Sequence, residues 1–253
     1  MPKYQQILIY IIDWIFKYIP YRKHPRRSEA KVVAHRGWHD NSETQENTLA
    51  AFEKALDKGL FGIEFDIRWT KDLIPVVHHD PGLERIWKRD FKISEHSFSE
   101  LRQEVPEIPT LEEVVEKFGG KLHFFIELKW EDYPAVQEQN SILLFILKNL
   151  NPGEHYHFLS LDPRVFDCFT TLPRKYKFLV GLTNLNEISD VAIKGEFAGV
   201  MGHYLLMGQD KIAEHLRANQ KIGVGYPRSK NIIDRELTRG VEYIFTNHPW
   251  ELL

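Results

Sequence analysis

From Lys31 onward, short apolar runs alternate with segments in which apolar residues recur every three or four positions. We predict eight strands, at residues 31–35, 61–67, 122–128, 156–161, 176–182, 197–202, 221–226 and 241–246. Helices are expected between them, with clear periodicity at residues 48–58, 110–118 and 134–149. Alternating strands and helices favour a parallel sheet, and eight such strands favour a (β/α)8 TIM barrel of the α/β class. A doubly wound open sheet is the alternative.

Two helix boundaries carry specific signals. Gly59 directly follows the helix at 48–58 and has the position of a C′ glycine. Thr110 and Glu113 have capping-box spacing after Pro109, so a helix should begin there.

Residues 73–79 (LIPVVHH) interrupt the alternation, because only a tight turn at 70–72 separates this apolar run from the strand at 61–67. A parallel crossover needs about a dozen residues or more. The run should therefore fold back as an antiparallel hairpin beyond the barrel rim. This geometry would return His79 to the end of the second strand.

The first 27 residues differ from the rest. Residues 7–19 are strongly apolar, but as a helix they would span only about 20 Å, against about 30 Å for a bilayer core. A polar stripe and an apolar face recur at helical spacing, the first at Gln6, Tyr10, Asp13 and Lys17 and the second at Leu8, Ile11, Ile12, Ile15 and Ile19. A basic run follows at residues 22–27, and no small-residue cleavage pattern marks a signal peptide.

These features favour an amphipathic helix that lies in the membrane surface at its cytoplasmic, inner face, with basic residues at the headgroups. A tilted span and a terminal helix packed on the domain, or on a second copy of the chain, are the alternatives. We accordingly divide the chain into residues 1–27, the N-terminal segment, and residues 28–253, the barrel domain.

Composition and charge exclude several classes. The 253 residues are 43% hydrophobic and 27% charged, as in an ordinary globular protein. The net charge of −3 gives no basic footprint for nucleic acid. A single cysteine, Cys168, excludes an internal disulfide, and its apolar surroundings predict a buried structural thiol.

Reactive residue types gather where the first three barrel strands end, which is where barrel active sites lie. His35 and Arg36 end the first strand. Glu64 and Asp66 lie on the second and Glu127 and Lys129 at the end of the third, each pair two residues apart and so on one face.

Three carboxylates that converge on one rim repel each other unless a cation or protons lie among them. Oxygen ligands without cysteine suggest Mg²⁺ or Ca²⁺. With one divalent cation and the two basic groups, the site would carry about one positive charge, which suits a singly negative phosphodiester. Two histidines near it could share the proton transfers as base and acid.

The stretch from Ala34 to Arg85 resembles the glycerophosphodiester phosphodiesterase family, within the PLC-like phosphodiesterase superfamily. The shared motifs are HRG at 35–37, ENT at 46–48, ExD at 64–66, TKD at 70–72, PVVxHD at 75–80, IPTLEEVVE at 108–116 and IELK at 126–129. Weaker similarity continues in FLSLDP at 158–163 and IFTNHP at 244–249.

The resemblance implies a TIM barrel and a function, the metal-dependent hydrolysis of glycerophosphodiesters to glycerol 3-phosphate and an alcohol. It implies roles for individual residues: His35 and His79 as acid and base, Glu64, Asp66 and Glu127 as ligands of one divalent cation, Glu46 as a supporting residue, and Arg36 and Lys129 as phosphate ligands. His79 rather than His78 matches the motif, because it directly precedes Asp80. Asn47 or Thr48 is expected to cap the next helix.

Four departures from the family pattern concern the substrate. Gln45 replaces a proline, the loop between Arg85 and Ile108 is short, the strand near 221–226 lacks its tryptophan motif, and Asn247 stands where an aspartate is usual. Tyr226 could supply the missing aromatic ring. A membrane-surface enzyme could also act as a lysophospholipase D or a cyclising phosphodiesterase, and a non-catalytic membrane-attached phosphate-binding module is the third hypothesis.

Overall fold

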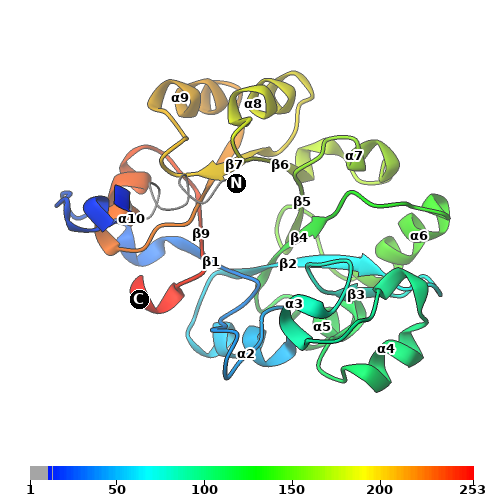
Figure 1. The fold of residues 1–253 in the computed structure, drawn as a ribbon. Coiled ribbons are helices and arrows are strands. Elements are labelled where there is room, and N and C mark those ends of the chain that lie inside the picture. Colours follow the sequence, from blue (N-terminus) through cyan, green and yellow to red (C-terminus); the bar gives the residue numbers. More distant parts are fainter. Residues whose placement is uncertain (1–10, 13) are drawn as a thin grey trace.

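All eight predicted strands form in the computed structural model, which describes residues 11–12 and 14–253. They are parallel and close into a barrel, because β1 pairs with both β2 and β9 (Figure 1). Their bounds, each within two residues of the prediction, are β1 Lys31–His35, β2 Gly62–Trp69, β4 His123–Leu128, β5 Tyr156–Ser160, β6 Lys177–Gly181, β7 Gly199–His203, β8 Lys221–Gly225 and β9 Tyr243–Thr246. The predicted (β/α)8 barrel is confirmed.

Helices surround this barrel on the outside (Figure 1). The longer ones follow the strands as expected: α2 Leu49–Asp57, α5 Leu111–Phe118, α6 Val136–Leu147, α8 Leu185–Lys194, α9 Gln209–Arg217 and α10 Lys230–Thr238. Shorter elements complete the connections: α3 Glu84–Trp87, α4 Phe98–Glu104, α7 Val165–Cys168, and the 3₁₀ turns η1 Arg27–Glu29, η2 Ile93–Glu95, η3 Arg174–Tyr176 and η4 Pro249–Glu251.

The predicted helix boundaries are confirmed in detail. Gly59 follows α2 with φ +67°, a left-handed conformation that glycine adopts without a steric penalty. Thr110 and Glu113 form a reciprocal capping box at the start of α5.

The predicted hairpin is also confirmed. Strand β3 (Pro75–Val77) runs antiparallel to the end of β2, and Ile67 pairs with Val77. β2 is longer than its neighbours, so this pairing lies beyond the barrel rim. It brings the histidines that follow β3 back to the mouth of the barrel.

Two apolar layers hold the barrel together. Inside it, buried side chains of the strands form one cluster, made of Val33, Phe125, Leu159, Phe178, Met201, Tyr243 and Phe245. Outside it, the opposite faces of the strands pack against the helices in a larger cluster. Cys168 is free and only partly buried at the edge of that cluster, so the prediction of a buried thiol is wrong.

The N-terminal segment contacts the barrel where the structure describes it. Residues 11–12 and 14–18 are helical, and the Phe16 ring lies 6.1 Å from that of Tyr204. Asn231 donates a hydrogen bond of 3.2 Å to the Lys17 carbonyl. No helix within residues 11–12 and 14–253 is long and apolar enough to cross a membrane. Gln6, Leu8, Tyr10 and Asp13 of the predicted helix lie outside the described residues.

Candidate active site

Three buried carboxylates meet at the mouth of the barrel. Glu64 and Asp66 project from the same face of β2, and Asp66 lies beside Glu127 in the register between β2 and β4. One oxygen of each carboxylate lies within 4.8 Å of the others. The parallel register therefore brings together acids that are far apart in the chain.

Arg36 and Lys129 lie among these acids, as their positions predicted. The Lys129 ammonium is 2.6 Å from Asp66 Oδ1 and also contacts Glu127. The Arg36 guanidinium lies 3.5 Å from Asp66 Oδ2. Two cations thus partly balance three acids within one cluster.

A tight turn after β1 aims Arg36 at the cluster. Arg36 has φ +59°, and its N–H donates to the Glu64 carbonyl at 2.8 Å. Gly37 follows with φ +84°, and a Cβ there would lie 2.8 Å from the Ala51 side chain. Only glycine fits this close approach of the turn to α2.

Burial and charge move the pKa values of the three acids in different directions. Burial, and then Asp66 and Glu127, raise the pKa of Glu64 well above its ordinary value. Burial also raises the pKa of Glu127, against the pull of Lys129. Burial acts in the same direction on Asp66, but Lys129 and Arg36 outweigh it and hold the pKa of Asp66 far below its ordinary value.

This cluster fits a divalent cation by its own chemistry. Glu64 Oε1 is buried and has no hydrogen-bond partner within the described part of the chain. A buried carboxylate oxygen without a partner is costly, and a bound cation would satisfy it. The three acids offer only oxygen ligands, the type that Mg²⁺ and Ca²⁺ prefer.

Glu46 lies behind the cluster. Its carboxylate accepts hydrogen bonds from Arg36 at 2.9 Å, from Arg85 at 2.6 and 3.1 Å, and from Asn41 at 2.8 Å. Burial would raise the pKa of Glu46, but Arg85 and Arg36 hold it well below the ordinary value. Glu46 thus remains ionised and fixes the Arg36 side chain.

The prediction that Asn47 or Thr48 caps α2 is confirmed. Thr48 is the cap, since its hydroxyl accepts a hydrogen bond from the Ala51 N–H. Asn47 is not, because its φ of +58° turns its side chain into the site, where it donates to Asp66 Oδ2 at 3.0 Å. The amide therefore helps to orient a predicted cation ligand.

His79 lies at the mouth, where the hairpin was expected to bring it. Its Nδ1 lies 2.7 Å from Asp80, and Arg85 in turn donates to Asp80. Because the carboxylate only accepts, His79 Nδ1 carries a proton and Nε2 is left for chemistry. Burial lowers the pKa of His79, while nearby Asp66 opposes that shift.

His35 is held by a neutral partner. Its Nδ1 lies 2.6 Å from Asn247 Oδ1, so this nitrogen carries the proton. The Tyr226 hydroxyl then donates to Nε2 at 3.3 Å. Burial, and then Arg36, lower the pKa of His35 to about 3, so the ring is neutral at physiological pH.

Sequence reasoning missed three contributions to this site: those of Asn41 and Arg85, and the hydrogen bond from Asn47 to Asp66. Asn41, from the loop after β1, and Arg85, from α3, complete the hydrogen bonds of Glu46. Arg85 lies in α3, a helix of only four residues, which is too short for an apolar periodicity to mark it. The one available signal was its position five residues after Asp80 in the motif.

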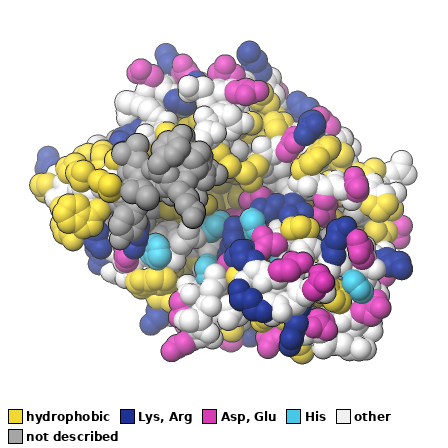
Figure 2. Space-filling model, viewed as in Figure 1, with side chains coloured by type: hydrophobic (Ala, Val, Ile, Leu, Met, Phe, Trp, Pro, Cys, Tyr) yellow, Lys and Arg dark blue, Asp and Glu magenta, His cyan; other side chains and the backbone are white. Residues whose placement is uncertain are grey.

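Three of the predicted site residues, His35, Arg36 and Glu46, open into a cleft of about 600 Å³, which is also lined by His39, Asp40, Asn41, Tyr226, Asn247, His248 and Trp250. In Figure 2, histidine side chains lie near the centre of the visible face, next to Lys, Arg, Asp and Glu side chains. The cleft therefore combines charged, polar and aromatic walls.

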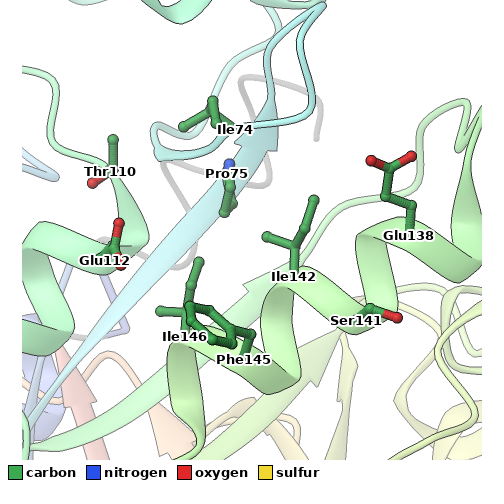
Figure 3. Close-up of a pocket in the computed structure, with 9 residues that line it drawn as sticks. All are labelled: Ile74, Pro75, Thr110, Glu112, Glu138, Ser141, Ile142, Phe145 and Ile146. Atoms are coloured by element: carbon green, nitrogen blue, oxygen red, sulfur yellow. The ribbon is translucent and has the colours of Figure 1, made fainter.

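A second hollow of about 390 Å³ has a different character (Figure 3). It lies between the β3 hairpin, the start of α5 and the outer face of α6, and it shares no lining residue with the cleft. Ile142, Phe145 and Ile146 of α6 form one wall, and Ile74 and Pro75 face them. Its largely apolar walls differ from the cluster of buried acids.

Comparison with known proteins agrees with this geometry. A profile of the Glycerophosphoryl diester phosphodiesterase family matches residues 35–249. A glycerophosphodiester phosphodiesterase from Caldanaerobacter subterraneus subsp. tengcongensis is 32% identical over 242 residues, which cover 88% of this chain and 96% of the relative.

Solved structures share the fold. The crystal structure of a glycerophosphodiester phosphodiesterase from Thermotoga maritima matches with a TM-score of 0.72 at 24% identity, covering 92% of this chain and 97% of the other. An Oleispira antarctica phosphodiesterase in complex with the product sn-glycerol-3-phosphate matches with a TM-score of 0.72 at 22% identity, covering 88% and 94%. By motif, fold and profile, the chain belongs to the glycerophosphoryl diester phosphodiesterase family.

Proposed function

We propose that the protein hydrolyses glycerophosphodiesters to glycerol 3-phosphate and an alcohol, with one divalent cation held by Glu64, Asp66 and Glu127. One observation carries the proposal. Three carboxylates are buried together at the mouth, and one buried oxygen of Glu64 has no partner among the described residues. Such an arrangement is unfavourable in a merely structural cluster and is suited to a cation site.

The charges match the substrate. The three acids, a divalent cation, Arg36 and Lys129 sum to about one positive charge. A phosphodiester carries one negative charge, so its binding neutralises the site. Arg36 can grip two phosphate oxygens at once, and Lys129 adds a point charge.

The two histidines divide the proton transfers. His35 is neutral, and its Nε2 lone pair is turned to Tyr226 and Glu64. We therefore assign His35 as the general base, which accepts the proton of the attacking oxygen. Asp80 stabilises a protonated His79, so His79 donates a proton to the leaving alcohol. Glu46 acts indirectly, by holding Arg36 in place.

Mg²⁺ and Ca²⁺ both suit an all-oxygen ligand set of this kind. When bound, the cation would polarise a phosphoryl oxygen and supply positive charge to the transition state. The Oleispira antarctica relative was solved with sn-glycerol-3-phosphate, which supports the proposed product for this chain.

The test is a panel of glycerophosphodiesters assayed with Mg²⁺, Ca²⁺ and a chelator, with products identified by phosphorus NMR. We expect glycerol 3-phosphate to form with at least one cation and to disappear after chelation. Turnover that persists after thorough chelation would remove the cation from the proposal. An absence of turnover with every diester and cation would overturn the hydrolase itself.

A second candidate substrate class is lipid-derived. The described part of the N-terminal helix leaves Ile11, Trp14 and Ile15 exposed, which favours peripheral membrane contact through residues 7–27 at the inner face of a membrane. The same cleft would then act as a lysophospholipase D or a cyclising phosphodiesterase. A cyclic phosphate in the phosphorus spectrum would identify the cyclising reaction.

A further inference from the structure

We infer that the mouth of the barrel is itself a lipid-binding face, on which apolar loop residues and the N-terminal helix together seat the enzyme on a lipid surface with its cleft toward the lipid. This inference rests on the proposed function for the position of the cleft. It extends that function by adding a second, separate contact surface and an orientation.

Five exposed hydrophobic side chains encircle the mouth, and we call them the rim residues. They are Trp130, Leu161, Leu182, Leu206 and Trp250. Each lies within four residues after the end of a barrel strand, namely β4, β5, β6, β7 and β9 in turn. The carboxyl ends of parallel barrel strands share one edge, so the rim residues belong to the same face as the catalytic groups.

The opposite edge differs from the mouth in this respect. None of the exposed large hydrophobic side chains in the described part of the chain lies in a loop that enters a strand from the floor of the barrel. Scattered exposed leucines are ordinary on protein surfaces, but a segregation of this kind is not. This uneven distribution of exposed hydrophobic side chains indicates that the mouth contacts an apolar partner.

The N-terminal helix continues this face. Its Ile11, Trp14, Ile15 and Tyr18 are exposed, while Phe16 turns inward. Lys17 connects the helix to the mouth through two contacts. Its carbonyl accepts a hydrogen bond from Asn231 at the start of α10, and its ammonium lies 3.7 Å from the Glu251 carboxylate. In Figure 2, hydrophobic side chains lie above and to the left of the central histidines.

A lipid surface fits this face better than a second copy of the chain. The rim residues stand singly on separate loops, with polar residues between them, as in loops that insert into a lipid interface. Tryptophan and tyrosine favour that interface. The exposed Arg22, Lys23 and Arg26 follow the helix directly and complement anionic headgroups. A second copy seated here would close both clefts, whereas a lipid surface presents substrate to them.

The inference defines a substrate class. A phosphodiester that carries one acyl chain would keep its chain in the lipid while its phosphate enters the cleft. Turnover of such a vesicle-borne substrate should therefore depend on the rim residues more than turnover of a soluble diester does.

The experiment compares two double variants of the full chain. Leu182→Asp/Leu206→Asp places charges on the rim, at residues that are 56% and 50% exposed. Phe145→Asp/Leu216→Asp is the matched control on the outer helices, at residues that are 61% and 47% exposed. Each protein is sedimented with vesicles of phosphatidylglycerol and phosphatidylcholine, and thermal unfolding checks its fold.

We expect the rim variant to bind vesicles at least about tenfold more weakly than wild type, and the control variant to bind as wild type does. The ratio of turnover of vesicle-borne lysophospholipid to turnover of soluble diester should fall in the rim variant by a similar factor. Equal binding by wild type and the rim variant would overturn the inference, and so would equal losses in both variants.

Two further outcomes separate the possibilities. If wild type binds vesicles but hydrolyses no diester with any cation, the proposed function fails and the lipid-binding face stands. If wild type ignores vesicles, and light scattering shows a dimer that the rim variant disrupts, the mouth is an interface between copies and the inference is overturned.

Discussion

The two ends of the barrel are built from the same eight strands but differ in the balance of acidic and basic side chains. At the mouth, Glu64, Asp66 and Glu127 are buried beside one another, and an oxygen of Glu64 has no partner in the described chain. At the floor, one acid, Glu242, is shared by two lysines, Lys31 at 2.7 Å and Lys221 at 3.3 Å.

Histidines differ between the ends in the same manner. At the floor, His123 accepts a hydrogen bond from His157 at 2.8 Å and donates one to the Glu154 carbonyl at 2.8 Å. A hydrogen bond between the two rings, and one from His123 to the backbone, thus hold them in place. At the mouth, Asn247 and Asp80 hold the Nδ1 atoms of His35 and His79, and the His35 ring lines the cleft. The end that buries an unpartnered carboxylate oxygen, among the described residues, is therefore the candidate site, whereas the paired groups at the floor fit a structural role.

The largest effect should follow from removing one charge at the mouth. Glu64→Gln keeps the shape of the side chain but removes a cation ligand, so activity should fall about a thousandfold or more. Because burial raises the pKa of Glu64, its charge destabilises the cation-free fold, and the variant should unfold at an equal or higher temperature in chelator. Near-normal turnover of this variant would contradict the cation site.

A pair of neighbouring histidines sharpens the assignment. His79→Gln should lower kcat about a hundredfold or more, because it removes a proton donor. His78→Gln should cost less than about tenfold, since the His78 Nδ1 only bonds the Asp80 carbonyl. Steady-state kinetics of both variants make the comparison, and equal losses would mean that the hairpin matters only as a support.

Tyr226→Phe should have a moderate effect. It removes the hydroxyl that donates to His35 Nε2, a bond worth about 1 kcal/mol, so kcat should fall about threefold to tenfold. That bond favours the neutral ring, and its loss raises the pKa of His35. The acidic limb of the pH–rate profile should accordingly move to higher pH, and an unchanged profile would show that Tyr226 does not act through His35.

At the floor, His123→Leu/His157→Leu should leave activity within about twofold of wild type and change only the pH dependence of stability. Burial lowers the folded-state pKa values to about 4 for His123 and about 3 for His157, below the unfolded value of 6.5. The unfolded state therefore binds more protons between these values, so stability is full above pH 6.5 and is lost as pH falls.

For two such groups the slope of the unfolding free energy reaches at most about 2.7 kcal/mol per pH unit. Urea unfolding between pH 7.5 and pH 5 measures it. The double variant should show a shallower slope than wild type, and a loss of turnover in this variant would break the distinction between the two ends.

The strands and the core of the site were predictable because their signals are local. Runs of β-branched and aromatic residues defined the strands, and the two-residue spacing of Glu64 and Asp66 placed both on one face. The same local reasoning made two predicted strands one residue too long at their carboxyl ends, where it included Leu161 and Leu182. The strands end at Ser160 and Gly181, so these leucines are exposed. An apolar residue next to an apolar run does not reveal on which side of the rim it lies.

The remainder depends on loop geometry that spacing does not encode. Asn47 reaches Asp66 only because its backbone adopts a left-handed conformation. Arg85 meets Glu46 across 39 positions of sequence. Asn247 was noted as a departure from the family pattern, but its contact with His35 required the closure of β9 onto β1.

The contact between Arg27 and Asp234 decides where the chain can be shortened. The Asp234 carboxylate is fully buried and receives hydrogen bonds from the Arg27 guanidinium and from the His24 N–H. Cutting after residue 27 would leave that carboxylate buried without its cation, which typically costs several kcal/mol. A loss of vesicle binding or activity in such a truncated protein would therefore report misfolding as well as the loss of the N-terminal helix. A deletion that stops before Phe16 keeps this anchor and removes only what lies beyond it.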